Sequence, residues 1–246
     1  MKKWLKWTLL VLILLIVSIF LYLRFGAGMD LPEGRSGEEA DALAMKMMSA
    51  VGDEAWDDTR FVHWTFTGRN TYTWDRTEGM VRLESGGLTV VLDTATRNGW
   101  AEKDGEALSG AELENALKDA WAYFCNDSFW LIAPLKAMDP GTEREVVETE
   151  EGKALMVSYS SGGVTPGDRY MWYLGEDGLP YAYRMWVQIL PTPGVRVTWE
   201  DWTNLHTGVK IAQKHMMGPV DVAITDLKSG SSLSDIDMPE DLFQTP

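Results

Sequence analysis

Apolar residues in this chain change from helical spacing to strict alternation and back, which divides it into predicted helices and strands. From Ala40 to Val51 they recur every three or four positions, and Ser36 and Glu39 before them have the spacing of a helix capping box. From 59 to about 100 they alternate with polar residues, and turn sequences divide this region into about four or five short strands.

A second helix is predicted from Ser109, again with a glutamate three positions later, and its apolar stripe runs from Leu113 to Phe124. The sequence SFWLIAPLKAMDPG follows at 128–141 and predicts a short helix plus an extended segment laid across a sheet. Alternation returns from about 143 to 226. This order is typical of an α+β protein whose helices group against one long curved antiparallel sheet.

The first hairpin carries one aromatic and one polar face. A three-residue loop at 68–70 places Trp64 opposite Trp74 on the aromatic face and His63 opposite Asp75 on the polar one. A two-residue loop would set aromatic side chains against threonines, so the three-residue loop is preferred.

The later hairpin, YRMWVQILPTPGVRVTWEDW at 183–202, carries tryptophans on both faces. A five-residue loop at 190–194 places Met185 opposite Trp199 on an apolar face. Trp186 and Trp202 then lie on the polar face, where stacking on arginine and contact with a partner protein both remain open.

The N-terminus combines lysines with an apolar run from Trp7 to Leu23 that Arg24 closes. This predicts a signal anchor rather than a cleaved signal peptide, because no small-residue cleavage site follows. The basic residues before the run place the N-terminus in the cytoplasm and the rest of the chain outside. The expected organisation is a cytoplasmic stub and transmembrane helix (1–24), a tether (25–35), one domain (36–230) and a tail (231–246).

Charge and residue types exclude several function classes. The chain has 22 basic and 37 acidic residues, and four of the basic ones lie within residues 1–24, which leaves about −19 on the exported part. Such a domain is repelled by phosphate backbones, so nucleic acid is not an expected partner. The single cysteine, Cys125, lies near the helical stripe and is expected to be a buried, inert thiol. No catalytic motif or metal-ligand spacing is present, so we expect neither an enzyme, a cofactor nor a metal site.

Three stretches, DDTRFVHWTFTGRNTYTWDRTEGMVRLE, NDSFWLIAPLKAMDPGT and GLPYAYRMW…VTWEDW, resemble an uncharacterised exported bacterial family of the LolA-like superfamily. The resemblance covers most of residues 38–225 and is most specific at 126–141. It implies an unclosed β-barrel around an apolar cavity, with the helices as a lid. Lipoprotein carriers of this superfamily hold acyl chains there and have no catalytic residues.

The predicted cavity takes its walls from the strands and from the lid: Trp64, Tyr72, Trp74, Met185, Val187 and Trp199, with Trp121, Phe129, Trp130 and Leu131. Pattern alone does not separate a lined pocket from a filled core, since both need apolar residues at the same positions.

Two functions therefore remain open. The first is a domain anchored in the inner membrane, lying in the periplasm or outside the cell, that binds an acyl chain or another apolar ligand for lipid or lipoprotein handling or envelope sensing. The second is a non-enzymatic interaction scaffold with a closed core, which presents Trp186 and Trp202 to an envelope protein.

Overall fold

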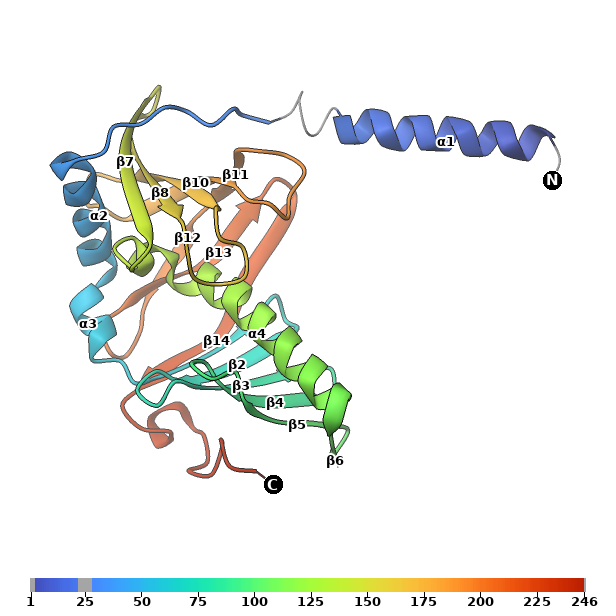
Figure 1. The fold of residues 1–246 in the computed structure, drawn as a ribbon. Coiled ribbons are helices and arrows are strands. Elements are labelled where there is room, and N and C mark those ends of the chain that lie inside the picture. Colours follow the sequence, from blue (N-terminus) through green and yellow to red (C-terminus); the bar gives the residue numbers. More distant parts are fainter. Residues whose placement is uncertain (1–2, 22–27, 246) are drawn as a thin grey trace.

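The computed structural model describes residues 3–21 and 28–245, which form an α+β arrangement of helices and antiparallel strands (Figure 1). The helices are α1 (Lys3–Leu21), α2 (Glu38–Val51), α3 (Asp53–Asp57) and α4 (Gly110–Ile132), with the 3₁₀ turns η2 (Ala133–Lys136) and η3 (Ser234–Ile236).

The described strands form two antiparallel sheets, where the sequence predicted one. The larger has the order β12-β13-β14-β1-β2-β3-β4-β5-β6, and the smaller β11-β10-β9-β8-β7. The strands of the larger sheet are β1 (Phe61–Phe66), β2 (Asn70–Asp75), β3 (Met80–Ser85), β4 (Leu88–Asp93), β5 (Gly99–Lys103), β6 (Glu106–Ala107), β12 (Glu200–Asn204), β13 (Lys210–Met217) and β14 (Val220–Gly230). Those of the smaller sheet are β7 (Thr142–Thr149), β8 (Gly152–Tyr159), β9 (Arg169–Leu174), β10 (Pro180–Trp186) and β11 (Val195–Thr198).

The two sheets meet where β11 continues into β12. The predicted single strand breaks at Trp199, and the left-handed backbone of Asp201 (φ 56°) turns the chain into the larger sheet. The amide of Met216 donates to Thr198 Oγ1 at 3.0 Å, so β13 lies beside β11 at the junction. The sheets are unclosed at the other side, because the edge strands β6 and β7 do not pair.

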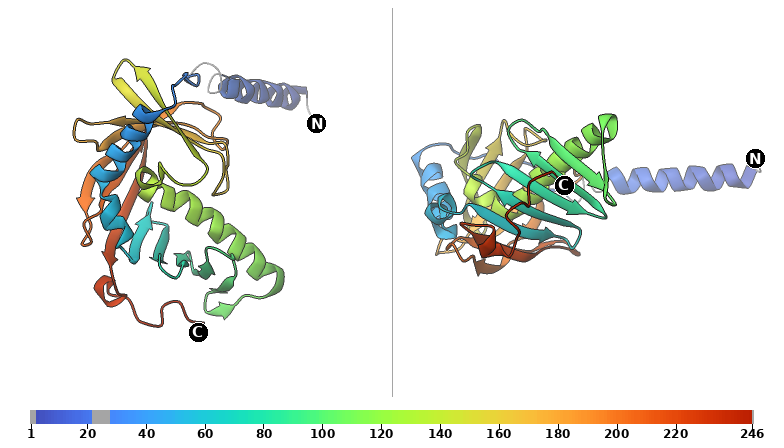
Figure 2. Two further views of the ribbon diagram at one scale, coloured as in Figure 1. Left: turned by 60° about the vertical axis from the view of Figure 1, so that its left-hand side comes forward. Right: turned by 90° about the horizontal axis from the view of Figure 1, so that it is seen from below.

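Helix α4 joins these two edges and crosses from one sheet to the other (Figures 1 and 2). Ser109 is its N-cap residue, as predicted, but its side chain makes no capping hydrogen bond. The helix continues through Asn126 and Asp127 to Ile132 and is followed by η2, so the short helix and extended segment predicted at 128–141 are wrong. The start of α2 also differs, since its N-cap is Gly37 and not Ser36.

Both predicted hairpin registers are wrong, although most side chains lie on the predicted faces. Trp202 is an exception: it was predicted on the polar face, but it packs beside Trp199 against the buried residues of both sheets. In the first hairpin the loop is 67–69, so Trp64 lies opposite Tyr72 and Trp74 opposite Val62. In the second, Met185 lies opposite Val195 and the connection runs from 187 to 194. Both shifts move the partner by an even number of residues, which changes neighbours but not faces.

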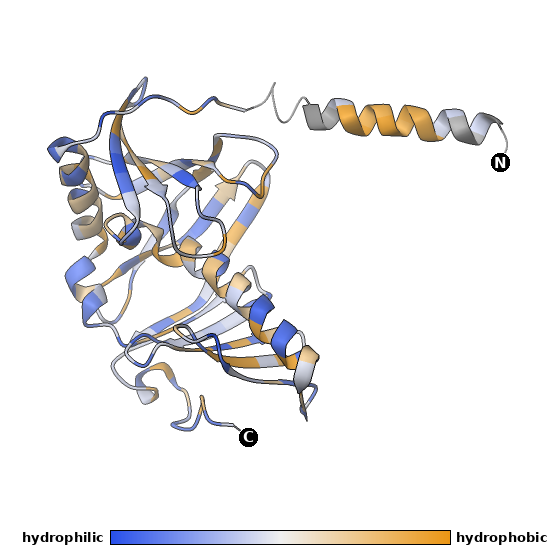
Figure 3. Cartoon of the chain, viewed as in Figure 1, coloured by the Kyte–Doolittle hydropathy of each residue, from blue (hydrophilic) through white to orange (hydrophobic). Residues whose placement is uncertain are grey.

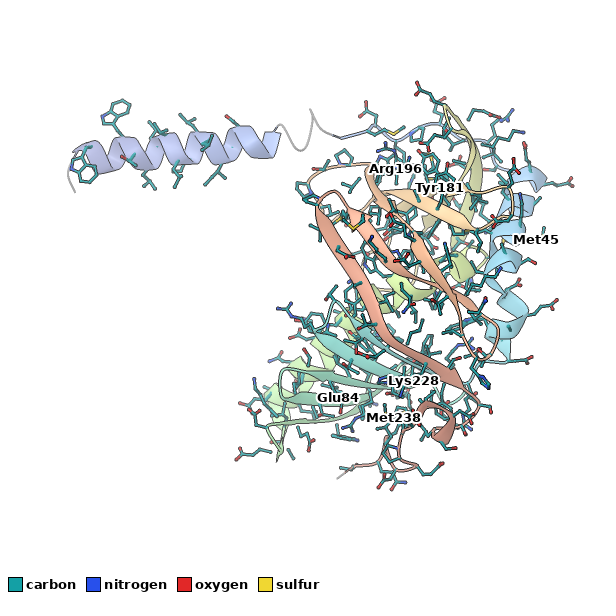
Figure 4. The ribbon with its side chains drawn as sticks, turned by 180° about the vertical axis from the view of Figure 1, so that it is seen from behind. Met45, Glu84, Tyr181, Arg196, Lys228 and Met238 are labelled. Carbon is teal, nitrogen blue, oxygen red and sulfur yellow. The ribbon has the colours of Figure 1, made fainter. Side chains whose placement is uncertain are left out.

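The polar face of the first hairpin is also buried, which the alternation did not predict. The C-terminal segment after β14 returns against the sheet and packs Leu233 and Ile236 on Phe61. Figure 4 labels Lys228 and Met238 in this region, where the Lys228 ammonium lies 2.9 Å from an Asp237 carboxylate oxygen. The predicted tail at 231–246 therefore packs on the domain through its apolar side chains, which are Leu233, Ile236, Met238, Leu242 and Phe243.

Helix α1 has the apolar composition that the sequence suggested (Figure 3), with exposed side chains from Trp7 to Ser18. Within the part of the chain that is described, no helix meets the length and apolarity required to cross a membrane. Arg24 and tether residues 25–27 lie outside the described residues.

Candidate functional site

The ten predicted cavity residues gather on the inner side of the two sheets, beneath α4. Trp64, Tyr72, Leu131, Met185 and Trp199 are buried, and the other five are partly buried. They fall into two aromatic groups. We call them the Trp64 cluster (Trp64, Tyr72, Trp74, Trp121, Phe124, Leu131) and the Trp199 cluster (Phe129, Tyr159, Tyr170, Trp172, Tyr183, Met185, Val187, Trp199, with His215).

The Trp64 cluster packs the first hairpin against α4. Trp64 stacks on Tyr72 with ring centroids 4.7 Å apart, and the edge of Phe124 meets Trp74 at 5.2 Å. Offset stacking and edge-to-face contacts are the favoured aromatic geometries. Phe124 and Leu131 reach this cluster because they lie on the buried stripe of α4.

The Trp199 cluster fills the concave side of the smaller sheet. Trp172 lies edge-on to both Trp199 and Tyr183, at 5.1 and 5.0 Å. Phe129 of α4 packs on Tyr170 at 4.5 Å, so the C-terminal part of this helix covers the cluster.

Trp130 lies between the two clusters. Its ring is 6.5 Å from Phe66 on the first side and 6.1 Å from Tyr183 on the second. His215 lies 5.6 Å from Trp130 and 4.4 Å from Trp199, which continues the contact. The interior is thus one continuous apolar region.

The ten side chains pack mostly on one another. One hollow of about 300 Å³ lies beside Trp186 and Leu190 and touches only Val187 of the ten, and another of about 370 Å³ lies beside Trp100 and Leu242. Because all ten residues are buried or partly buried, the interior beneath α4 is closed to solvent in this conformation.

Several polar atoms in this interior have no hydrogen-bond partner within the protein. Among the described residues they are the indole nitrogens of Trp64, Trp74, Trp121, Trp172 and Trp199, the Tyr159 hydroxyl and both ring nitrogens of His215. Most buried polar groups in proteins are paired, and an unpaired one costs about 1–3 kcal/mol. All of these residues line the two clusters or touch them, so the unmet polar groups are concentrated beneath α4.

Burial lowers the pKa of His215 to about 4, so its ring is neutral at pH 7. The carbonyl groups of Thr198 and Ala212 oppose this shift in part, although neither has the geometry of a hydrogen bond to the ring. A neutral imidazole offers one donor and one acceptor to any polar group that approaches it.

A buried carboxylate, Asp127, belongs to the site and was not predicted. Its Oδ2 accepts from the Tyr72 hydroxyl at 2.6 Å and from the Asn70 amide at 2.8 Å, while Oδ1 accepts from Asn126. Ser85 Oγ donates to Asn70 Oδ1 at 2.8 Å, which extends the network to β3. Burial raises the pKa of Asp127 against these hydrogen bonds. The available signal was its spacing from Phe124 and Leu131, which places it on the buried stripe.

The remaining polar candidates have ordinary roles. His63 Nδ1 lies 2.9 Å from Thr73 Oγ1, whereas Asp75 pairs with Arg60 at 2.8 Å, so the predicted His63–Asp75 pair is wrong. Burial raises the pKa of the Cys125 thiol to about 11, so it is protonated at neutral pH. No group of three or more His, Cys, Asp or Glu side chains suited to a metal occurs within the described ranges.

Trp186 and Trp202 are both engaged within the chain. The Trp186 indole donates to the Met29 carbonyl at 2.9 Å, and the Trp202 indole donates to the Pro180 carbonyl at 3.2 Å. Both rings are partly buried. Arg196, one of the two arginines near Trp186 on the predicted polar face, instead lies over Tyr173 and binds Glu151, to which Tyr181 also donates (Figure 4).

Comparison with known proteins leaves the family open. No protein-family model matches the chain, and no curated protein is significantly similar to it. Among solved structures, a DUF1329 family protein from Desulfovibrio piger is similar with a TM-score of 0.47 and 10% identity, over 85% of this chain and 100% of that one. A similarity at this level carries no argument about function.

Proposed function

We propose that the chain is a membrane-anchored extracytoplasmic domain that binds an acyl chain or a similar apolar ligand between α4 and the two sheets. The observation that carries this proposal is the concentration of unpartnered polar atoms in the aromatic interior. A filled core normally pairs its polar atoms, whereas a binding site keeps a few for its ligand.

The unpartnered groups also describe the ligand. Five of the unpartnered atoms are indole nitrogens, which can only donate a hydrogen bond. These five match a ligand whose polar part carries acceptor oxygens. The carboxylate or ester of an acyl chain supplies such acceptor oxygens. The apolar length of the same molecule suits the aromatic walls.

Binding requires α4 to move, because the interior is closed. The first half of α4 is the weaker half: its side chains from Ala111 to Asp119 are exposed or only partly buried. Its second half is held by Asp127 and by the buried Leu131 and Ile132. A lid that opens from the Ser109 end would uncover Trp121 and Trp74 first.

The site would lie outside the cytoplasm if α1 is the predicted signal anchor. Lys2, Lys3 and Lys6 precede the apolar run, which orients such an anchor with its C-terminal domain outside. The acidic exported part fits this address, because it has no electrostatic attraction to nucleic acid.

The test is a lipid-binding measurement on the full chain purified in mild detergent. Native mass spectrometry would reveal copurified lipid, and a titration with dansyl-undecanoic acid would give the affinity. We expect saturable binding that unlabelled oleate reverses. Absence of both copurified lipid and saturable binding rejects the proposal.

Two matched tryptophans localise the binding. Trp121 and Trp100 are both partly buried and both have an arginine near the ring, Arg97 at 4.9 Å and Arg82 at 5.9 Å. Trp121 lies on α4 above the interior, whereas Trp100 packs with the C-terminal segment on the outer face. Trp121→Leu is expected to weaken binding about tenfold, or about 1.4 kcal/mol. Trp100→Leu is expected to leave the affinity unchanged.

The competing function is a ligand-free interaction scaffold, and the closed packing of the ten residues favours it. Its predicted contact residues, Trp186 and Trp202, make hydrogen bonds within the chain, so their replacement tests stability and not partner binding. A delipidated protein that neither binds the probe nor changes α4 protection in hydrogen exchange supports the scaffold.

A further inference from the structure

The strands of the smaller sheet end in two chemically different sets of loops. At one end the turns TEEG (149–152) and GEDG (175–178) carry four acidic residues. At the other, the connection 160–168 (SSGGVTPGD) has one charged residue, Asp168, which is buried, and the connection 187–194 (VQILPTPG) has none. The neighbouring turn between β13 and β14 is also uncharged together with its two flanking residues (217–220, MGPV). We call these three connections the uncharged end.

The uncharged end is held together and exposes apolar side chains. Gln188 joins two of its loops, because its backbone amide donates to Asp168 Oδ1 at 3.1 Å and its side-chain amide to the Pro166 carbonyl at 2.6 Å. Ile189, Val164 and Val220 are 67%, 48% and 47% exposed. Each of the three connections thus presents one large apolar side chain to solvent, beside the 300 Å³ hollow at Trp186 and Leu190.

The segment that follows α1 is fixed to this same end. The Met29 amide donates to the Pro193 carbonyl at 2.9 Å, and the Met29 carbonyl accepts from Trp186 at 2.9 Å. Gly28 packs so closely on Pro193 that a Cβ there would lie 2.5 Å from the proline ring. Figure 1 shows the chain from α1 reaching the domain at the side of β10 and β11.

Covalent geometry limits how far this end lies from α1. Six residues, 22–27, separate Leu21 from Gly28. Seven Cα–Cα steps span at most about 25 Å when fully extended. If α1 spans the bilayer, the uncharged end is therefore the part of the domain that starts within about 25 Å of the membrane surface.

We propose that the uncharged end rests on the lipid bilayer, with Ile189, Val164 and Val220 entering its interfacial region. This inference rests on the proposed N-terminal anchor and adds an orientation to it. Charge favours one orientation, since the acidic turns at the opposite end are repelled by anionic lipid while the uncharged loops are not. Burial of each apolar side chain contributes further, at about 25 cal/mol per Å² removed from water.

The experiment places a fluorophore at each end of the sheet in the full chain reconstituted into phosphatidylcholine–phosphatidylglycerol vesicles. Cys125→Ser removes the native thiol, and Ile189→Cys or Val164→Cys then carries an NBD label. Glu176→Cys, in the acidic turn, is the matched control. We expect a blue-shifted emission and quenching by doxyl-labelled lipids at 189 and 164, and neither at 176.

Equal quenching at 189 and 176, or none at 189, overturns the inference. Alkaline carbonate extraction and dansyl-undecanoic acid binding, measured on the same samples, separate it from the proposed function. If the chain stays in the vesicles and binds the probe, but the label at 189 is not quenched, only the proposed orientation is rejected. A chain that carbonate extracts has no anchor, which overturns both the anchor and this orientation.

Discussion

The Trp64 and Trp199 clusters lie on either side of Trp130 and are built from the same kinds of aromatic side chain, yet they treat buried polar groups differently. In the first, the indole nitrogens of Trp64, Trp74 and Trp121 are unpartnered. Its buried carboxyl group, Asp127, is however surrounded by donors from Tyr72, Asn70 and Asn126. In the second, neither His215 nor Tyr159 has a partner in the protein. Buried polar networks specify one structure when they are satisfied, and each unsatisfied group is a cost. The hydrogen-bonded Asp127 network of the first cluster therefore holds α4 in place. In the second cluster, Tyr159 and His215 can accept or donate a hydrogen bond to a polar group of a ligand.

Removing the carboxylate of Asp127 is the largest expected perturbation. Asp127→Ala leaves the Tyr72 hydroxyl and the Asn70 amide buried without an acceptor, at a cost of about 4 kcal/mol in the free energy of unfolding. Asp127→Asn keeps an acceptor oxygen and nearly the same volume, so it is expected to cost less. Urea unfolding measures both, and equal losses would show that the network does not support α4.

The pH dependence of Asp127 has a definite sign. Because burial raises its pKa above the ordinary 3.8, the folded state favours the protonated form. Its contribution to stability is fully present below pH 3.8 and is lost as pH rises through the folded pKa. The wild type is therefore expected to gain stability relative to Asp127→Asn as pH falls through that window.

His215 is expected to titrate in the opposite direction, with an effect of about 3 kcal/mol between its ordinary pKa of 6.5 and the folded value of about 4. The folded state favours the neutral ring, so this contribution is present above pH 6.5 and is lost as pH falls toward 4. His215→Phe removes it. The free energy of unfolding of the wild type should fall relative to that of His215→Phe between pH 7 and pH 4.5. A difference between the two proteins that does not change with pH would contradict the burial of the ring.

Replacing one tyrosine by phenylalanine in each cluster is expected to give the smallest change in stability, and it compares the two clusters most directly. Tyr72→Phe removes a 2.6 Å hydrogen bond to Asp127 and is expected to destabilise the protein by about 2 kcal/mol. Tyr159→Phe removes a hydroxyl without a partner, so delipidated protein should be unchanged or slightly more stable. Thermal unfolding of the two variants tests this, and equal destabilisation would mean that Tyr159 has a partner after all.

The difference between the two clusters also predicts where the polar part of a ligand would bind. If the polar part of a bound lipid pairs with the Trp199 cluster, Tyr159→Phe and His215→Phe should weaken dansyl-undecanoic acid binding although they leave the fold stable. Tyr72→Phe should act mainly through stability. The reverse pattern would move the ligand to the Trp64 cluster.

Much of this fold could be predicted from alternation and helical spacing. Ala40, Met47 and Val51 are buried on α2, and the alternating residues Trp64, Tyr72, Trp199 and Met185 all face inward. The alternation predicted from about 143 matches the start of β7 at Thr142. Whether the ten predicted site residues enclose a ligand was not decidable, since the same side chains fill a core when α4 is closed.

The sequence by itself determined most of the faces, because the period of two or of 3.6 places a side chain inside or outside whatever its neighbours are. Trp202, which follows the left-handed Asp201 and packs beside Trp199, is an exception. Tertiary structure alone decided the registers and the polar partners. Trp64 faces Tyr72 because the loop begins at Thr67, and Asp127 finds Tyr72 and Asn70 because α4 continues through a stretch that resembles a helix end. Both depend on contacts between segments far apart in the chain, which no local pattern records. The docking of Met29 on Pro193, which orients the uncharged end toward α1, has the same origin.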